Sequence, residues 1–142
     1  MSFIKRHLEA RLRKAAGQFP VVTMTGPRQS GKTTLAQAVF PEHEYVSLES
    51  PEHRDFAQND PRGFLGQFDS PVILDEVQRV GDLFSYIQVL VDQTGRTGQF
   101  ILTGSQNFLL LSKIGQSLAG RTAVLHLLPF SRSELVGRKM AD

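Results

Sequence analysis

Apolar residues in this chain fall into short runs and helix-spaced stripes that alternate from one end to the other. The first stripe has the i, i+4 spacing of one helix face and predicts a helix over residues 3–16. Its members are Ile4, Leu8, Leu12 and Ala15. Mostly apolar runs, several of them rich in β-branched residues, predict strands. These runs lie at residues 21–25, 45–48, 71–75, 100–103 and 122–128.

Helical patterns separate the predicted strands. Apolar side chains recur at helical spacing over residues 32–40, 83–91 and 107–114, and Pro41 ends the first of these segments. Two Ser-Pro and Asp-Pro pairs, at residues 50–51 and 60–61, combine a capping residue with a proline suited to the first helical position. We therefore expect two additional short helices after the second strand.

The strand runs are apolar at successive positions rather than at every second one. Strands of this kind are buried on both faces, as in a parallel sheet that helices cover on either side. Strands alternating with helices, with no repeat of 20 to 50 residues, predict a single α/β domain of three layers with right-handed crossovers.

Composition narrows the function classes. The 142 residues include no cysteine, which excludes disulfides, thiolate nucleophiles and Fe–S clusters, and the four histidines show no metal-binding spacing. The longest apolar run is four residues, 108–111, far below the ~20 that a membrane-spanning helix needs. We expect a soluble, cytoplasmic protein that makes no membrane contact.

Basic residues are concentrated at the N-terminus. Residues 1–16 carry five of them against Glu9 alone, whereas the rest of the chain is slightly acidic. Three interpretations compete: a solvated helix face, a contact with nucleic acid or another partner, and an Arg-rich transit peptide. The helical stripe that runs almost directly into the first strand favours a helix that belongs to the domain.

A phosphate-binding motif lies between the first predicted strand and the helix that follows it. Residues 26–33 read GPRQSGKT and fit GxxxxGK[ST], in the strand-loop-helix context that this motif requires. Its glycines let backbone N–H groups face phosphates, Lys32 reaches the β- and γ-phosphates, and the Thr33 hydroxyl binds Mg²⁺. The candidate nucleotide-binding residues are Gly26, Pro27, Arg28, Gln29, Ser30, Gly31, Lys32, Thr33 and Thr34. For Arg28, a phosphate or partner contact and plain solvent exposure both remain open.

Two acids end the third predicted strand, at the sheet edge where open α/β folds bind ligands. Asp75 is suited to hold Mg²⁺ together with Thr33, and Glu76 to accept a proton from the water that attacks the γ-phosphate. The alternative is a solvated acid pair, which the P-loop upstream disfavours. An acid directly after the metal ligand also distinguishes the chain from small GTPases and most nucleotide kinases.

Polar residues follow the fourth strand, and an arginine precedes the fifth. Ser105 is the first candidate for a residue that senses the γ-phosphate and Thr103 the second, whereas a helix-capping role for Ser105 is the alternative. Arg121 is a candidate for stabilising transition-state charge, in its own subunit or a neighbouring one, against a surface salt bridge.

Four segments together carry a family resemblance: GPRQSGKTTL, ILDEVQ, LTGSQNFLL and SLAGRTAVLHLLPFSRSEL. Over nearly the whole chain, to Leu135, the sequence resembles the prokaryotic AAA-type ATPase domain of a family related to archaeal and STAND-type ATPases. The resemblance implies a P-loop NTPase fold of the ASCE/AAA type, with strand order 5-1-4-3-2. It also implies ATP with Mg²⁺, a catalytic role for Glu76 and, in such proteins, a second domain that follows the ATPase core.

We therefore expect residues 1–142 to form one ATPase core that comprises an N-terminal helix at 3–16, a core at 20–130 and the start of a truncated C-terminal helix at 131–142. A capping box at 131–134 predicts that helix. The expected function is Mg²⁺-dependent ATP hydrolysis coupled to a missing effector domain or a partner, in a monomer or an oligomer. One rival is a nucleotide-gated binding module with little turnover that contacts nucleic acid. The other rival is a small-molecule kinase, which is disfavoured because the sequence shows no arginine-rich lid segment after the third predicted strand.

Overall fold

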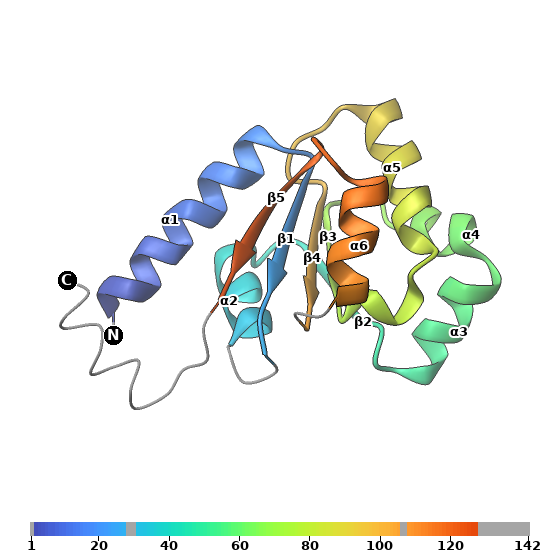
Figure 1. The fold of residues 1–142 in the computed structure, drawn as a ribbon, viewed down its shortest axis with the longest axis horizontal. Coiled ribbons are helices and arrows are strands. Elements are labelled where there is room, and N and C mark those ends of the chain that lie inside the picture. Colours follow the sequence, from blue (N-terminus) through green and yellow to red (C-terminus); the bar gives the residue numbers. More distant parts are fainter. Residues whose placement is uncertain (1, 28–30, 106–107, 128–142) are drawn as a thin grey trace.

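Helices and strands alternate along the chain as predicted (Figure 1). The structure, a computed structural model, describes residues 2–27, 31–105 and 108–127. Its helices are α1 (Ser2–Gln18), α2 (Lys32–Val39), α3 (Pro51–Asn59), α4 (Pro61–Gly66), the 3₁₀-helix η2 (Val77–Val80), α5 (Leu83–Thr94) and α6 (Phe108–Ser117). Its strands are β1 (Val21–Thr25), β2 (Glu44–Ser47), β3 (Val72–Asp75), β4 (Phe100–Gly104) and β5 (Thr122–His126). The one described element without a sequence prediction is η2.

The five strands form one parallel sheet in the order β2-β3-β4-β1-β5. This order is the predicted 5-1-4-3-2 sheet seen from its other end, so the fold class is confirmed. Thr25, the last residue of β1, lies opposite Gly104 on β4 and His126 on β5. Because all strands run the same way, their carboxyl ends meet at one edge of the sheet.

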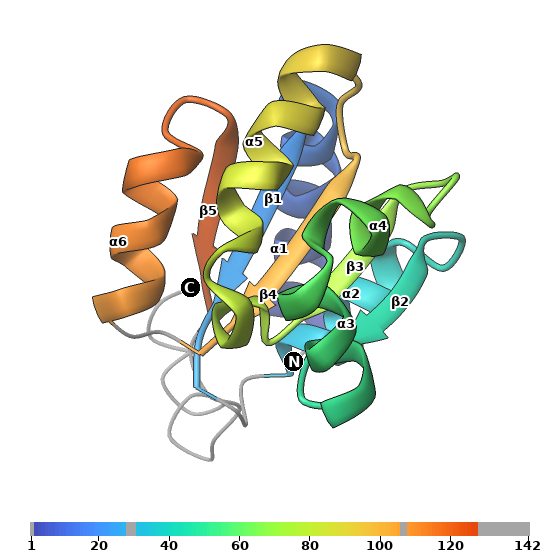
Figure 2. The same ribbon diagram turned by 90° about the vertical axis from the view of Figure 1, so that its right-hand side faces the viewer.

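Both faces of the sheet are covered, which explains the continuous apolar strands. One face, with Val72, Leu74 and Leu102, packs against α3, α4, α5 and α6. The other face, with Ile73 and Ile101, packs against α1 and α2. Figure 2 shows these two helix layers on opposite sides of the sheet. Successive strand residues enter opposite cores, so each position of β3 and β4 is buried.

Local sequence sets the ends of several helices. Both short helices carry proline in their first turn, and the Asp60 carboxylate of α4 accepts a hydrogen bond from the Gly63 N–H (3.0 Å). Helix α5 ends at Gly95, whose left-handed backbone (φ 67°) is accessible to glycine without a Cβ penalty. The two short helices predicted after the second strand are thus confirmed.

Two further expectations concern the C-terminal segment and membrane-spanning helices. The C-terminal helix expected at 131–142 lies outside the described residues. Within the described residues, no helix has both the length and the apolar character required to span a bilayer.

Candidate functional site

The predicted phosphate-binding loop connects β1 to α2 at the carboxyl edge of the sheet. The Gly26 N–H donates to the Gly104 carbonyl (3.3 Å), which holds the start of the loop against β4. Gly31 adopts a left-handed conformation (φ 78°) immediately before α2 and accepts the Leu35 N–H (2.9 Å). Arg28, Gln29 and Ser30 lie outside the described residues. Thr34 is exposed on the first turn of α2.

Lys32 is buried, with 3% of its side chain exposed. Its Nζ lies 3.5 Å from Glu76 Oε2 and donates to the Pro27 carbonyl (3.4 Å). A buried ammonium group is costly unless an opposite charge and hydrogen-bond acceptors compensate it. The structure therefore joins the loop lysine to the acid at the end of β3, two residues that the sequence separates by more than forty positions.

Asp75 accepts hydrogen bonds from three hydroxyl groups. Thr33 donates to its Oδ1 (3.0 Å), Thr103 to the same oxygen (2.5 Å), and the Tyr45 hydroxyl to Oδ2 (2.7 Å). The donors come from α2, β4 and β2, so three elements orient one carboxylate. Partial burial, together with the hydrogen bond to Asp75 and its negative charge, raises the pKa of Tyr45 above its usual value. Tyr45 therefore stays a hydroxyl donor at neutral pH.

The Thr33 and Asp75 oxygens fit a magnesium ion. Two neighbouring ligands of an octahedral Mg²⁺, each at about 2.1 Å, lie about 3 Å apart, close to the separation found between these oxygens. Among the described residues no group of three or more His, Cys, Asp or Glu side chains could hold a metal. Such a sparse donor set suits Mg²⁺ that also binds phosphate oxygens and water, because Mg²⁺ seldom uses an all-protein cage.

Glu76 is buried and held by four neighbours. Gln78 donates to its Oε1 through Nε2 (2.7 Å), Ser105 donates to the same oxygen (3.3 Å), and Lys32 faces Oε2. Its backbone N–H donates to Thr103 Oγ1 (3.3 Å). Glu76 has φ 56°, the one positive φ among the described non-glycine residues. A left-handed backbone costs a non-glycine residue of order 1 kcal/mol, and such strain is concentrated at functional sites.

Ser105 was the first candidate for a sensor of the γ-phosphate. Its hydroxyl donates to Glu76 Oε1 (3.3 Å). The residues between Ser105 and α6 lie outside the described residues, and the helix-capping alternative stays a prediction. Thr103, the second candidate, contacts Asp75. Both residues lie beside the acids, and their sensing roles stay predictions.

Arg121 is the one predicted site residue within the described part of the chain that lies away from the others. It directly precedes β5, and its carbonyl accepts the N–H of Val21 at the start of β1, so it sits at the amino edge of the sheet. Its guanidinium forms two hydrogen bonds to Asp92 on α5 (2.7 and 2.9 Å), which lower the pKa of Asp92. This position argues against a role in the site of its own chain, one of the two possibilities left open above, and matches the surface salt bridge that was the alternative. A role toward a neighbouring subunit stays a prediction.

Two residues that contact the acids of the site, Tyr45 and Gln78, were not predicted from the sequence. Gln78 offered a signal, because a polar side chain two residues after Glu76 is close enough to contact it. Tyr45 offered none, because its contact with Asp75 depends on β2 pairing with β3.

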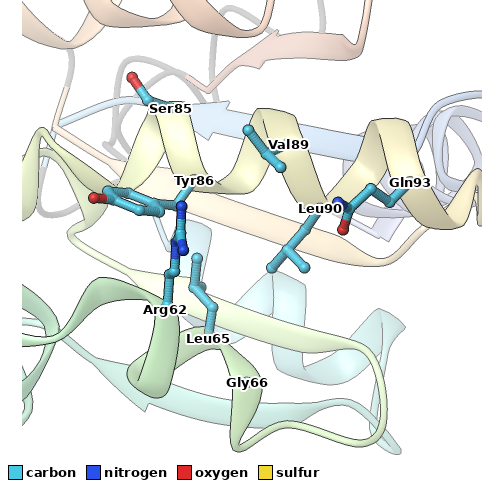
Figure 3. Close-up of a pocket in the computed structure, with 8 residues that line it drawn as sticks. All are labelled: Arg62, Leu65, Gly66, Ser85, Tyr86, Val89, Leu90 and Gln93. Carbon is cyan, nitrogen blue, oxygen red and sulfur yellow. The ribbon is translucent and has the colours of Figure 1, made fainter.

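A separate groove of about 450 Å³ lies between α4 and α5 (Figure 3). Leu65 of α4 and Val89 and Leu90 of α5 contribute apolar surface to it, and the Arg62 guanidinium stacks 5.8 Å from the centre of the Tyr86 ring. None of the site residues described above lines this groove. The groove and the carboxyl-edge site are therefore distinct surfaces.

The sheet order, the loop before α2 and the two acids at the carboxyl end of β3 define the class of P-loop NTPases. Within that class, a model of the AAA domain matches residues 18–136, and the chain belongs to this AAA-domain family.

Two longer proteins match the chain over nearly its whole length. The chain is 35% identical to two uncharacterized proteins, Mb2031c of Mycobacterium bovis and Rv2008c of Mycobacterium tuberculosis. Each alignment covers 97% of this chain and 31% of the relative, so the chain spans about a third of their length.

Two solved structures share the fold. The Walker-type ATPase of Pyrococcus abyssi has a TM-score of 0.60 at 19% identity, over 96% of this chain and 58% of that one. The P-loop NTPase domain of the Sigma-54 transport activator from E. coli has a TM-score of 0.61 at 15% identity, over 92% and 99%. At these identities the similarity concerns the fold alone.

Proposed function

We propose that this chain binds ATP together with Mg²⁺ and hydrolyses the bond between the β- and γ-phosphates, in the service of an effector domain or partner. The convergence of four side chains at one sheet edge carries the proposal. Lys32 lies 3.5 Å from Glu76, and Thr33 lies 3.0 Å from Asp75. A cation for phosphate, an oxygen pair for Mg²⁺ and a second acid are the groups that phosphoryl transfer to water requires.

Each residue has a separate role in the proposed reaction. Lys32 and the amides of the loop hold the phosphates, and Thr33 and Asp75 hold Mg²⁺, which when bound offsets charge on the β- and γ-phosphate oxygens. Glu76 takes a proton from water as the water oxygen bonds to the γ-phosphorus. The bond from that phosphorus to the bridging oxygen breaks, and ADP and phosphate leave. The role assigned to Ser105 is to respond to the γ-phosphate, and its hydrogen bond to Glu76 supports this assignment.

Two contacts between side chains of the site must be replaced when the nucleotide and the metal bind. Lys32 must leave Glu76 for the phosphates, and the Thr33 hydroxyl must cease donating to Asp75 when both bind the metal. These side chains are already gathered and desolvated, so little reorganisation is needed at binding. Glu76 then loses its cationic neighbour but keeps its neutral donors.

Phosphate release tests the proposal directly. We expect the purified chain to release phosphate from ATP in the presence of Mg²⁺, and to stop when EDTA removes the metal, because the reaction needs charge neutralisation at the phosphates.

Measuring specific activity over a range of protein concentrations, together with native mass, tests whether a neighbouring subunit contributes Arg121. Activity that is independent of concentration in a monomer would contradict that contribution. Comparison with a full-length mycobacterial relative tests the coupling to an effector, which predicts a different turnover in the longer chain.

A second candidate function is binding of nucleic acid by α1, controlled by nucleotide. The outward face of this helix carries four exposed cations, and none of them forms an ion pair within the described residues. They are Arg6, Arg11, Arg13 and Lys14. Leu12 and Ala15 bury the opposite face against the sheet. Exposed positive charges on one helix are suited to contact phosphates, which release counterions on binding.

We expect single- or double-stranded DNA to bind α1 with an affinity that falls steeply as salt increases. Arg6→Gln combined with Arg13→Gln should lower the salt slope by about 0.9 for each duplex phosphate that the variant no longer neutralises. Fluorescence anisotropy with a labelled oligonucleotide measures both quantities. Arg96→Gln, at an exposed position of the loop after α5, is the matched control. Binding that ignores salt, or that the paired variant leaves unchanged, would contradict this function.

A further inference from the structure

We propose that Gln78 is the positioning residue that holds Glu76 for its reaction with water once ATP has drawn Lys32 away. The inference rests on the proposed hydrolysis and concerns a residue without a part in it so far. Gln78 lies in η2, two residues after Glu76, and its Nε2 donates to Glu76 Oε1 at 2.7 Å. It is the shortest hydrogen bond of the Glu76 side chain among the described residues.

The three groups around the Glu76 carboxylate differ in their expected behaviour during the reaction. Lys32 pairs with Oε2, and it must move to the phosphates when ATP binds. The hydrogen bond from Ser105 is longer, at 3.3 Å, and this residue comes from the segment after β4. Gln78 is neutral and comes from the turn that Glu76 itself begins, so we expect its amide to stay with Glu76 when the phosphates attract Lys32. After the exchange it is therefore the main remaining anchor of the carboxylate.

The burial of the Gln78 amide oxygen also supports this role. Its Oε1 is buried and has no hydrogen-bond partner in the described structure. A buried oxygen without a partner lowers stability, and such exceptions in native proteins call for a functional explanation. Burying the amide for packing alone would favour an apolar side chain of similar size. The placement is explained if the Nε2 donor serves Glu76.

Gly104 makes room for this amide. A Cβ at position 104 would lie 2.6 Å from Gln78 Oε1 and 2.9 Å from Leu110 Cδ2, closer than real Cβ contacts permit. Gly104 does not have a positive φ, so backbone conformation does not require glycine there. Space for the Gln78 side chain accounts for the glycine, together with the contact to Leu110. Alanine at position 104 should therefore displace the Gln78 amide from Glu76, while the Gln78 and Glu76 side chains themselves stay chemically unchanged.

The first test measures steady-state hydrolysis by Gln78→Met, which keeps the length of the side chain and removes its donor. We expect kcat to fall about 10- to 100-fold, the loss typical of a misplaced catalytic group, with KM unchanged. Gly104→Ala should lower kcat in the same way. The double variant should be no slower than Gln78→Met alone, because both changes break the same hydrogen bond. Gln93→Met, at an exposed position of α5, is the matched control.

The second test does not depend on turnover. A double-mutant cycle of Gln78→Met and Glu76→Ala, read as shifts in the midpoint of thermal unfolding, measures whether the two side chains are coupled. We expect the midpoint shifts to be non-additive, both without nucleotide and with Mg²⁺ and a non-hydrolysable ATP analogue. Additive shifts in the presence of the analogue, or a Gln78→Met variant with wild-type kcat, would overturn the proposal. A wild-type chain that releases no phosphate would contradict the hydrolysis and leave the coupling result to decide on Gln78.

Discussion

Replacing Lys32 with alanine is expected to lower the affinity for ATP by about 100-fold or more. The ammonium is buried, so its interaction with phosphate is screened little by solvent, and a hydrogen bond to a charged group contributes about 1.5–3 kcal/mol. The loss of long-range attraction between lysine and a multiply charged phosphate chain adds to this value. Isothermal titration calorimetry with ATP and Mg²⁺ measures the change.

The same substitution leaves Glu76 without its cation in a buried site, and removing one partner of a buried pair is itself destabilising. A variant that combines Lys32→Met with Glu76→Gln removes both charges together. It should unfold at a temperature closer to that of the wild type and still fail to bind ATP. Wild-type affinity in either variant, measured on protein shown to be folded by thermal unfolding, would refute the phosphate-binding role of Lys32.

Replacing Glu76 with glutamine is expected to reduce phosphate release by about 10²- to 10⁴-fold while ATP binding is kept. The amide is nearly isosteric with the carboxylate and cannot accept the proton of the attacking water. It also no longer attracts Lys32, which lies 3.5 Å away and must change partner when ATP binds. We therefore expect the affinity for ATP to be equal to that of the wild type or higher. Single-turnover hydrolysis and calorimetry on the same protein separate the two effects.

The matched control is Glu52→Gln, which makes the same chemical change at an exposed position in the first turn of α3. It should leave both binding and hydrolysis as they are. If Glu76→Gln released phosphate at the wild-type rate, Glu76 would not be the general base. If it failed to bind ATP, Glu76 would instead be needed for the structure of the binding site.

Much of the fold could be predicted because it depends on local patterns. Five mostly apolar runs and the helical stripes between them predicted a parallel sheet with two helix layers, and the burial of every residue of β3 and β4 agrees with this. The Ser-Pro and Asp-Pro pairs predicted the starts of α3 and α4. The helix η2 was not predicted, because a segment of four residues is too short to show a helical repeat of apolar positions.

The pairing of side chains across the site was harder to predict. The motif identified Lys32, Thr33, Asp75 and Glu76, since each has a required position in the loop or at the strand end. It could not indicate that Lys32 contacts Glu76 in this structure. That contact depends on β4 lying between β1 and β3, an order that came from the family resemblance and not from periodicity.

By itself, the sequence determined the strand-loop-helix that presents a lysine and a threonine, and the strand that presents two acids. These depend on neighbouring residues, whose hydrogen bonding and burial follow local rules. Only the tertiary structure decided which distant groups complete the site. Tyr45 reaches Asp75 because β2 pairs with β3, and Arg121 lies away from both because it opens a parallel strand at the opposite edge. Gln78 faces Glu76 because the chain turns back after β3 into space left by Gly104. Register and packing set such contacts, and they arise only when segments far apart in the chain share one core.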